Sequence, residues 1–297
     1  MTNEEDFNTT EDSTLAFGVN AHDAPLSASR DESLPDLREV ERAKRYVAAY
    51  DPRRLPRVTS RDLDALLFIG RGYEVAQYQV HEAIFTGLAE GIMSRWTQRM
   101  LKRGFVAVER WAKVGINRLR LTHAGRDTLV AHGMTVDDVF TPKMPTALKD
   151  VQHTLWINDL RVVMPRLKFA PDTVAPAWLL QRRFAGTRDV VPDVLAIRSP
   201  HPGDLGFLLA VEIDLGGERL KAVFLPKLKA LLRVASEWSG GAPAAVVVLT
   251  RGERRAVAIR LGLEGESTPV LVSLLPSVPG RAGLRELAQQ LDVPGKR

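Results

Sequence analysis

Three carboxylates lie on or beside two otherwise apolar segments, residues 190–198 and 206–215: Asp193, Glu212 and Asp214. An isolated ionised carboxylate is costly to bury, so each needs a cation, a metal ion or open solvent. Glu212 and Asp214 are two positions apart, which places them on one face of an extended strand. Asp193 lies 19 positions before Glu212 with a turn-forming sequence between them. An antiparallel hairpin would bring all three acids to one edge.

Such a cluster is electrostatically unfavourable until a divalent cation binds, and carboxylates with open positions suit Mg²⁺ or Mn²⁺. That metal could orient water and stabilise charge on a phosphate. Lys227 follows on a predicted helix and supplies a cation that could reach this edge. The spacing alone leaves a second interpretation open, in which Glu212 and Asp214 only form ion pairs with Lys221, Arg182 or Lys227.

A second region could contact DNA, because nine bases and one acid occur between Ile92 and Arg126. In the helix predicted over 90–104, Ile92, Trp96 and Met100 recur every four residues and should pack inward. The opposite face and the following strands carry side chains that could contact bases or phosphates. The residues predicted to bind DNA are Arg95, Gln98, Arg99, Lys102, Arg103, Lys113, Arg118 and Arg120. The alternative is a solvated basic face used for protein contacts.

The elements that must position these residues follow one another in two groups. Residues 1–36 have the composition of a disordered acidic tail, and 37–58 predict a basic helix or linker. Over 59–138, three helices, a two-stranded hairpin and a final helix are the order of a winged helix-turn-helix. After a proline-containing boundary, 150–297 predict a helix, then strands over 177–185, 190–198, 206–215, 244–250 and 269–275 with helices over 220–238 and 281–291. The fold class is therefore α/β (α+β), with a mixed sheet and at least one crossover.

Composition narrows the class of protein. The chain has 297 residues and no cysteine, so it has neither disulfides nor thiolate metal sites. The acidic first residues do not resemble a secretory signal and no long apolar run is present, which predicts a cytoplasmic protein with no membrane segment. Residues 1–36 hold nine acids and one base, so the net charge of +5 leaves +13 on 37–297. A polyanionic partner such as double-stranded DNA fits this charge.

The order of several motifs resembles one known family. Behind the predicted winged helix, which ends in LTHAG, come HTLWINDLRV from His153, then VPDVL, then LLAVEIDLGGE and a later lysine. This arrangement is similar to the replication-relaxation family of plasmid and mobile-element proteins, over about residues 59–250. That family is similar to mobilisation relaxases built on a PD-(D/E)xK, restriction-endonuclease-like α/β sandwich.

The resemblance implies roles for individual residues. Asp193 and Glu212 would be metal ligands, Asp214 a third ligand or a supporting acid, and Lys227 the motif lysine, moved from the strand onto the next helix. His153, Asn158 and Asp159 match the family's H-x4-N-D helix, whose role does not follow from the residues themselves. His153 is expected to be a structural or supporting group, with a metal ligand as the alternative. Gln181 stands where the family commonly has a glutamate, and Glu218 would cap the following helix or hold the loop before it.

The resulting hypothesis is a replication or mobilisation protein that binds a plasmid or mobile-element origin and nicks or relaxes DNA with Mg²⁺ or Mn²⁺. The alternative is a non-enzymatic origin-binding or transcriptional regulatory protein. Its degenerate nuclease fold would then form a homodimer or recruit other replication factors.

Overall fold

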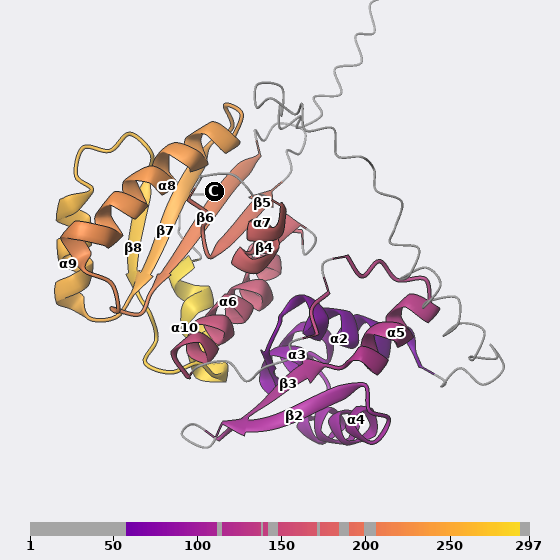
Figure 1. Ribbon diagram of the computed structural model, residues 1–297. Coiled ribbons are helices and arrows are strands. Elements are labelled where there is room, and N and C mark those ends of the chain that lie inside the picture. The colour runs from indigo at the N-terminus through magenta and orange to yellow at the C-terminus, as the bar shows by residue number, and fades with distance from the viewer. Residues whose placement is uncertain are drawn as a thin grey trace, which may run out of the picture.

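The computed structural model describes residues 58–111, 115–137, 139–141, 148–170, 173–183, 190–198 and 206–291. The acidic segment predicted to be disordered, and all but the last residue of the predicted basic helix or linker, lie outside these residues. The described chain forms an N-terminal unit, 58–141, and a C-terminal unit, 148–291, which lie against each other (Figure 1). None of the described helices is long and apolar enough to cross a membrane.

The N-terminal unit has the predicted order of three helices, a hairpin and a last helix, with one short strand added. Its elements are α2 (Ser60–Arg71), β1 (Val75–Ala76), α3 (Gln77–Ile84), α4 (Glu90–Lys102), β2 (Val106–Trp111), β3 (Ile116–Leu121) and α5 (His123–Ala131). The strands form an antiparallel sheet in the order β1-β3-β2. Thr59 begins α2 through a capping box with Asp62, which satisfies amides that the helix itself leaves unpaired.

The core of the N-terminal unit explains why these elements pack together. Leu66 and Ile69 of α2, Trp96 and Met100 of α4, and Leu119 of β3 are all buried in one cluster. The predicted inward stripe of α4 is therefore confirmed at Trp96 and Met100, whereas the third member, at the start of the helix, is half-buried. This packing leaves the other face of α4 in solvent.

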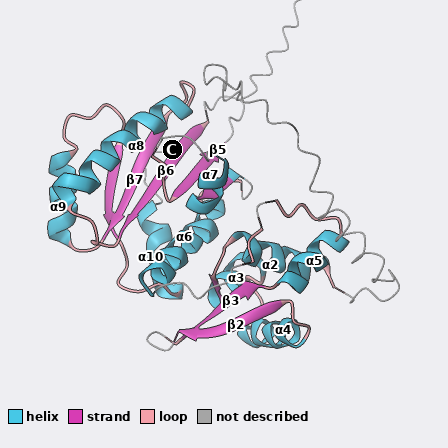
Figure 2. Cartoon of the chain, viewed as in Figure 1, coloured by secondary structure: helices cyan, strands magenta, loops and turns pink. Residues whose placement is uncertain are grey.

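The C-terminal unit is a five-stranded mixed sheet with helices on both faces (Figures 1 and 2). Its elements are α6 (Leu148–Arg166), β4 (Val174–Pro176), α7 (Ala177–Arg183), β5 (Val194–Arg198), β6 (Phe207–Asp214), the π-helical turn η3 (Leu220–Phe224), α8 (Leu225–Trp238), β7 (Ala244–Thr250), α9 (Glu253–Gly262), β8 (Val270–Leu274) and α10 (Arg281–Leu291). The strand order is β4-β5-β6-β7-β8. The β4-β5 and β5-β6 pairs are antiparallel, and β6-β7 and β7-β8 are parallel.

The alternation of side chains along β6 divides the interior into two cores. Val211 and Ile213 face α6 and α10, whereas Leu208 and Ala210 face α8 and α9. Glu212 and Asp214 have the same parity as Leu208 and Ala210, so they lie at the end of β6 on the face that α8 and α9 cover. This places the predicted acids beside the start of α8.

Two parts of the predicted fold are corrected. The segment 177–185 was expected to be a strand, but residues 177–183 form α7 and the strand before it is only Val174–Pro176. The Leu, Gln and Arg residues of this segment favour a helix. Its apolar residues suggested a strand, but in the helix Trp178 packs against one core and Leu180 lies in the other. Helix α9 was not predicted at all, and it supplies a residue that decides the role of Asp214.

Candidate active site at the end of β6

The predicted hairpin places Asp193 beside Glu212. Strands β5 and β6 are antiparallel, with Val194 opposite Val211. The next pair outward in this register is Asp193 and Glu212, and the amide of Ile213 donates a hydrogen bond of 2.7 Å to Oδ2 of Asp193. Both carboxylates are buried. The two acids therefore meet at the edge that the sequence predicted.

Helix α6 adds a histidine to this pair. Nε2 of His153 lies 3.0 Å from Oδ2 of Asp193. Burial lowers the pKa of His153, but the hydrogen bond and charge of Asp193, together with the charge of Glu212, outweigh this and raise the net pKa. A histidinium at this place would neutralise part of the charge of the two acids. The structure thus places His153 in contact with one of the two acids.

Helix α8 brings Lys227 to the other acid. Nζ of Lys227 donates a hydrogen bond to Oε1 of Glu212, and the Lys227 side chain is 30% exposed while that of Glu212 is 2% exposed. Pro226 lies in the first turn of α8, where the π-helical turn η3 gives way to an α-helix. A proline is tolerated in a first turn because its missing amide would have no partner there. The change from the π-helical turn to α8 therefore falls just before Lys227, whose side chain reaches Glu212.

The protonation of Glu212 follows from its neighbours. Burial, and then the charge of Asp193, raise the pKa of Glu212 to about 8, while Lys227 and His153 oppose this rise. Burial lowers the pKa of Lys227, but Glu212, Asp193 and Glu218 together raise it. Oε2 of Glu212 is buried and has no hydrogen-bond partner among the described residues. The site therefore has a carboxyl group that lacks a partner for one oxygen.

Asp214 does not belong to this cluster, which corrects its predicted role as a metal ligand. Its Oδ1 accepts hydrogen bonds from the amide of Gly216, at 2.8 Å, and from the Arg255 guanidinium, at 3.0 Å. Its Oδ2 accepts from the Thr250 hydroxyl, at 2.7 Å, and from Nε of Arg255. Both oxygens are already satisfied by α9, β7 and the loop. Asp214 therefore has a structural role, with both carboxylate oxygens held by hydrogen bonds.

The other supporting residues also differ from expectation. Gln181 is exposed on α7 rather than placed on a strand toward the site. Glu218 does not cap a helix, because the first residue of η3 is preceded by Arg219 and no side chain makes the cap hydrogen bond. Instead, the carbonyl oxygen of Glu218 accepts a hydrogen bond from Arg255 at 3.1 Å. Glu218 acts on the site only through its charge, which raises the pKa of Lys227.

Asn158 and Asp159 point away from the site and toward the N-terminal unit. Nδ2 of Asn158 donates to the carbonyl oxygens of Gly72, at 2.9 Å, and Glu74, at 2.8 Å. The Tyr78 hydroxyl and the Gln79 amide nitrogen each donate to Oδ1 of Asp159 at 2.7 Å. Burial raises the pKa of Asp159 to about 7. The two residues thus join the units, and the histidine is the residue of the H-x4-N-D sequence that contacts the acidic cluster directly.

The donor set fits a divalent cation at one place. Asp193 and Glu212 are two carboxylates, and Mg²⁺ is commonly held by one or two protein carboxylates, with water and substrate phosphate completing its coordination. The unpartnered oxygen of Glu212 is the observation that favours this fit. In the part of the chain that the structure describes, no three His, Asp or Glu side chains form a metal-binding group. The fit is therefore to a two-carboxylate site.

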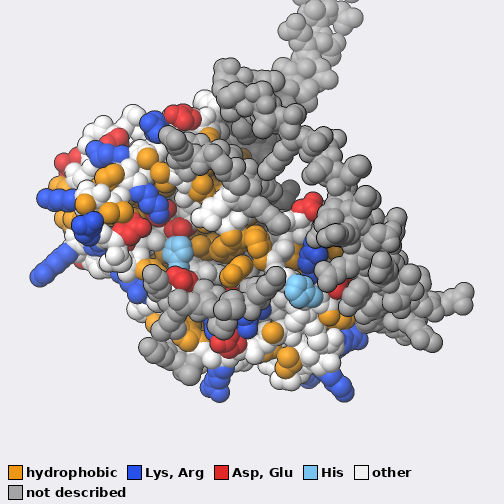
Figure 3. All heavy atoms as spheres, in the orientation of Figure 1, with side chains coloured by type: hydrophobic (Ala, Val, Ile, Leu, Met, Phe, Trp, Pro, Cys, Tyr) orange, Lys and Arg blue, Asp and Glu red, His pale blue; other side chains and the backbone are white. Residues whose placement is uncertain are grey.

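The basic face predicted on α4 lies partly in solvent. Arg95, Gln98 and Lys102 are exposed, and the Arg99 side chain is 49% exposed while its guanidinium donates to Oδ1 of Asp62 at 2.6 Å. Basic side chains project from the lower edge of the molecule, in the region of α4 and β2 (Figure 3). In the same view, acidic side chains lie beside a histidine on the C-terminal unit. Two chemically different surfaces are thus present on one molecule.

The predicted wing bases are corrected in part. Arg118 is only 6% exposed and pairs with Glu74, at 2.7 Å, and Glu109, at 2.8 Å. Arg120 lies near the same two acids, at 4.0 Å and 3.5 Å. These acids neutralise the two arginines, so the strand β3 does not present them as free cations. Arg103 is half-buried, and Lys113 lies outside the described residues.

Sequence reasoning missed several residues that shape the site and its surroundings. Arg255 braces Asp214, Trp178 and Arg161 contact the N-terminal unit, and Tyr78 and Gln79 hold Asp159. A signal existed for Arg255, because Ala256, Ile259 and Leu263 recur at helical spacing just after it. The contacts between units had no signal, since they depend on how two separately folded parts meet.

Comparisons with protein-family models, with curated proteins and with solved structures found no match.

Proposed function

We propose that the chain binds double-stranded DNA through the N-terminal unit, acting as a winged helix-turn-helix, and cleaves a phosphodiester bond with the C-terminal unit. The C-terminal unit would be a PD-(D/E)xK, relaxase-like domain, and the setting would be replication or mobilisation of a plasmid or mobile element. One observation carries this proposal: Asp193, Glu212, Lys227 and His153 meet at one sheet edge, although they come from four separate segments.

The proposed chemistry assigns a task to each of these residues. Asp193 and Glu212 would hold Mg²⁺ or Mn²⁺, which supplies Lewis acidity and lowers the pKa of bound water. Lys227, partly exposed beside Glu212, would stabilise the negative charge that develops on the phosphate. His153 and the Ile213 amide hold one oxygen of Asp193 and leave the other for the cation. Burial of Glu212 keeps its carboxyl group away from bulk solvent.

The DNA-binding part of the proposal rests on α4. Arg95, Gln98 and Lys102 are exposed on one helix, and Arg and Gln can make bidentate contacts with guanine and adenine. Lys102 would neutralise a phosphate. The order of three helices, antiparallel hairpin and final helix supports a winged helix, in which the third helix enters the major groove.

Cleavage is tested with supercoiled plasmid that carries the origin, with and without Mg²⁺ or Mn²⁺. Purified wild-type protein should convert supercoiled to nicked circles only with the metal, and Asp193→Ala should bind DNA equally well without nicking it. Arg233→Ala, a charge change at an exposed site on α8, is the matched control and should nick normally. Wild-type protein that binds the origin but never nicks it would overturn the enzymatic part.

A non-enzymatic regulator remains the second candidate, and one observation favours it. Asp214 occupies the place where the usual nuclease sequence has its lysine, and it is fully satisfied by Arg255, Thr250 and Gly216. A domain that lost cleavage could retain such a braced sheet edge for dimerisation or recruitment. Origin binding with neither nicking nor Mn²⁺ binding would select this candidate.

A further inference from the structure

The end of α2 is the place where the C-terminal unit grips the N-terminal unit. The last carbonyl groups of an α-helix have no partner within the helix. Here, side chains from α6 and α7 satisfy several of these groups and the loop that follows. The Trp178 indole donates to the Arg71 carbonyl oxygen at 2.8 Å, and Asn158 donates to those of Gly72 and Glu74 at 2.9 and 2.8 Å.

Two further observations show how closely this end of α2 is held. The Arg161 guanidinium donates to the Phe68 carbonyl oxygen at 3.3 Å and lies over the Phe68 ring, 4.5 Å from its centroid. A methyl group added at Gly72 would lie 2.6 Å from the Arg161 guanidinium and 2.9 Å from the Asn158 oxygen. The glycine is thus required for the close approach of α6.

The same two helices hold Asp193. Helix α6 carries His153, which contacts the Asp193 carboxylate, five residues before Asn158. Helix α7 begins at Ala177, whose amide donates to the Asp193 carbonyl oxygen at 2.7 Å, and the next residue is Trp178. Side chain and backbone of Asp193 are therefore held by the two elements that grip α2.

The other end of α2 holds the basic helix. Oδ1 of Asp62, in the first turn of α2, accepts from the Trp96 indole at 2.8 Å and from the Arg99 guanidinium at 2.6 Å. Arg99 is half exposed on α4. The first turn of α2 therefore contacts the proposed DNA-contacting face on α4. The last turn of α2 contacts α6 and α7, the helices that hold Asp193.

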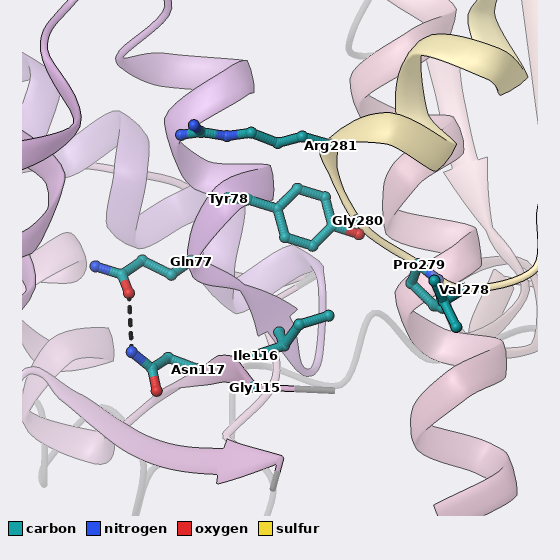
Figure 4. A pocket seen from close by; sticks show the side chains of 9 residues that line it. All are labelled: Gln77, Tyr78, Gly115, Ile116, Asn117, Val278, Pro279, Gly280 and Arg281. Atoms are coloured by element: carbon teal, nitrogen blue, oxygen red, sulfur yellow. Dashed lines mark hydrogen bonds between the residues drawn. The ribbon is translucent and has the colours of Figure 1, made fainter. Parts of the chain in front are cut away.

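A cleft of about 510 Å³ lies beside this junction, between the β2–β3 turn and the loop before α10 (Figure 4). Tyr78 projects into it from α3, and Arg281 extends from the start of α10 toward the helices of the N-terminal unit. Arg281 also pairs with Glu82 of α3 and with Glu90 at the start of α4. Polar contacts thus join the units beside Tyr78, next to an apolar cluster in which Ala76 and Trp111 pack against Val151 and Leu155 of α6.

We propose that α2 couples the α4 face to Asp193, with Asn158 and Trp178 acting as positioning residues for the acidic cluster. Occupation of α4 by DNA would act on Arg99 and Asp62, and the grip of Asn158 and Trp178 on the other end of α2 would transmit the change to α6 and α7. The DNA arm of this proposal rests on the proposed function, whereas the positioning of Asp193 does not. Coupling of this kind needs an element whose arrangement both sites influence, and α2 is that element.

The Ile213 amide provides a readout that needs neither metal nor cleavage, because it donates directly to the Asp193 carboxylate. Its hydrogen-exchange rate, measured by NMR, should rise about fivefold in Trp178→Phe and in Asn158→Ala, the factor expected when one ordinary hydrogen bond is lost. His153→Ala should raise it as well. Asp150→Asn, at an exposed site on α6, should leave it unchanged, and the amides of β7 serve as the internal control for global destabilisation.

The outcomes separate this proposal from the proposed function. An unchanged Ile213 rate in Trp178→Phe and Asn158→Ala, with β7 also unchanged, overturns the coupling whether or not the protein cleaves DNA. Trp178→Phe retains an aromatic ring and should fold even where Asn158→Ala does not. In the second arm, adding a duplex that binds should change the Ile213 rate in the wild type, and Trp178→Phe should reduce that change. A duplex that binds without affecting Ile213 also overturns the coupling, whereas failure of any duplex to bind contradicts only the proposed function.

Discussion

Asp159 should make the stability of the protein depend on pH below neutrality. Its carboxyl group is fully buried, no Lys or Arg of the described residues pairs with it, and burial raises its pKa from 3.8 to about 7. The titratable group that faces it is Tyr78, whose own pKa is raised well above its usual value by burial and by Asp159, so the phenol stays neutral. Gln79 donates to Asp159 but does not titrate.

The sign follows from the two pKa values. The unfolded chain ionises Asp159 from about pH 4, but the folded protein keeps the proton until about pH 7, so the folded state binds more protons between these values. The stabilisation is complete below the unfolded pKa and is lost as the pH rises through the folded pKa. Each pH unit in this window is worth about 1.4 kcal/mol, so a rise from pH 5 to pH 8 should cost roughly 2.5 kcal/mol.

The assay compares wild type with Asp159→Asn, which has nearly the same shape but cannot ionise. The unfolding free energy of each protein is measured in urea at pH 5, 6, 7 and 8. As the pH rises from 5 to 8, the value for the variant minus that for wild type should increase by roughly 2.5 kcal/mol and level off above about pH 7.5. Taking the difference removes the contributions of other titrating groups. A difference that stays constant from pH 5 to pH 8 would refute the reasoning, because it would mean that Asp159 has an ordinary pKa in the folded protein.

Three further outcomes are expected. Arg255→Met should lower the unfolding free energy by about 3–5 kcal/mol in urea titrations, because it leaves the buried Asp214 without its cation; adding Asp214→Asn should recover part of this loss, and full stability of the single variant would contradict the brace. Lys102→Ala should weaken duplex binding and reduce the slope of log K against log salt by about 0.9 for a lost phosphate contact, whereas the exposed Arg233→Ala should not; equal slopes in both variants would remove α4 from the proposed DNA-binding surface. Arg118→Met should lower the melting temperature, since Glu74 loses its buried partner, but should leave that salt slope unchanged; a reduced slope would return Arg118 to the DNA-binding surface.

Periodicity was sufficient to predict most elements of both units. The alternation in 190–198 and 206–215, with a turn between them, predicted the antiparallel hairpin, and hence the meeting of Asp193 and Glu212. It predicted a common face for Glu212 and Asp214 as well. Periodicity could not predict that Arg255 would neutralise Asp214, because that contact depends on a crossover helix that returns to the same sheet edge. Two residues on the same face of a strand, such as Glu212 and Asp214, therefore need not belong to the same site.

The remaining misses have a common physical cause. Arg118 was placed among DNA-binding residues because local charge is strongly positive, but Glu74 and Glu109 approach it from other strands and loops. Spacing alone could not show what Asn158 and Asp159 do, because their partners lie in the other unit. Contacts between residues far apart in sequence decide both cases. Local patterns contain little information about them.

The central claim is that Asp193 and Glu212, without Asp214, form a divalent-cation site. Calorimetric titration with Mn²⁺ tests it most directly, on wild type, Asp193→Asn, Glu212→Gln and Asp214→Asn, each shown by circular dichroism to be folded. The claim predicts one Mn²⁺ bound by wild type and by Asp214→Asn, and none by Asp193→Asn or Glu212→Gln. Mn²⁺ binding that survives in Asp193→Asn, or that is lost only in Asp214→Asn, would contradict it.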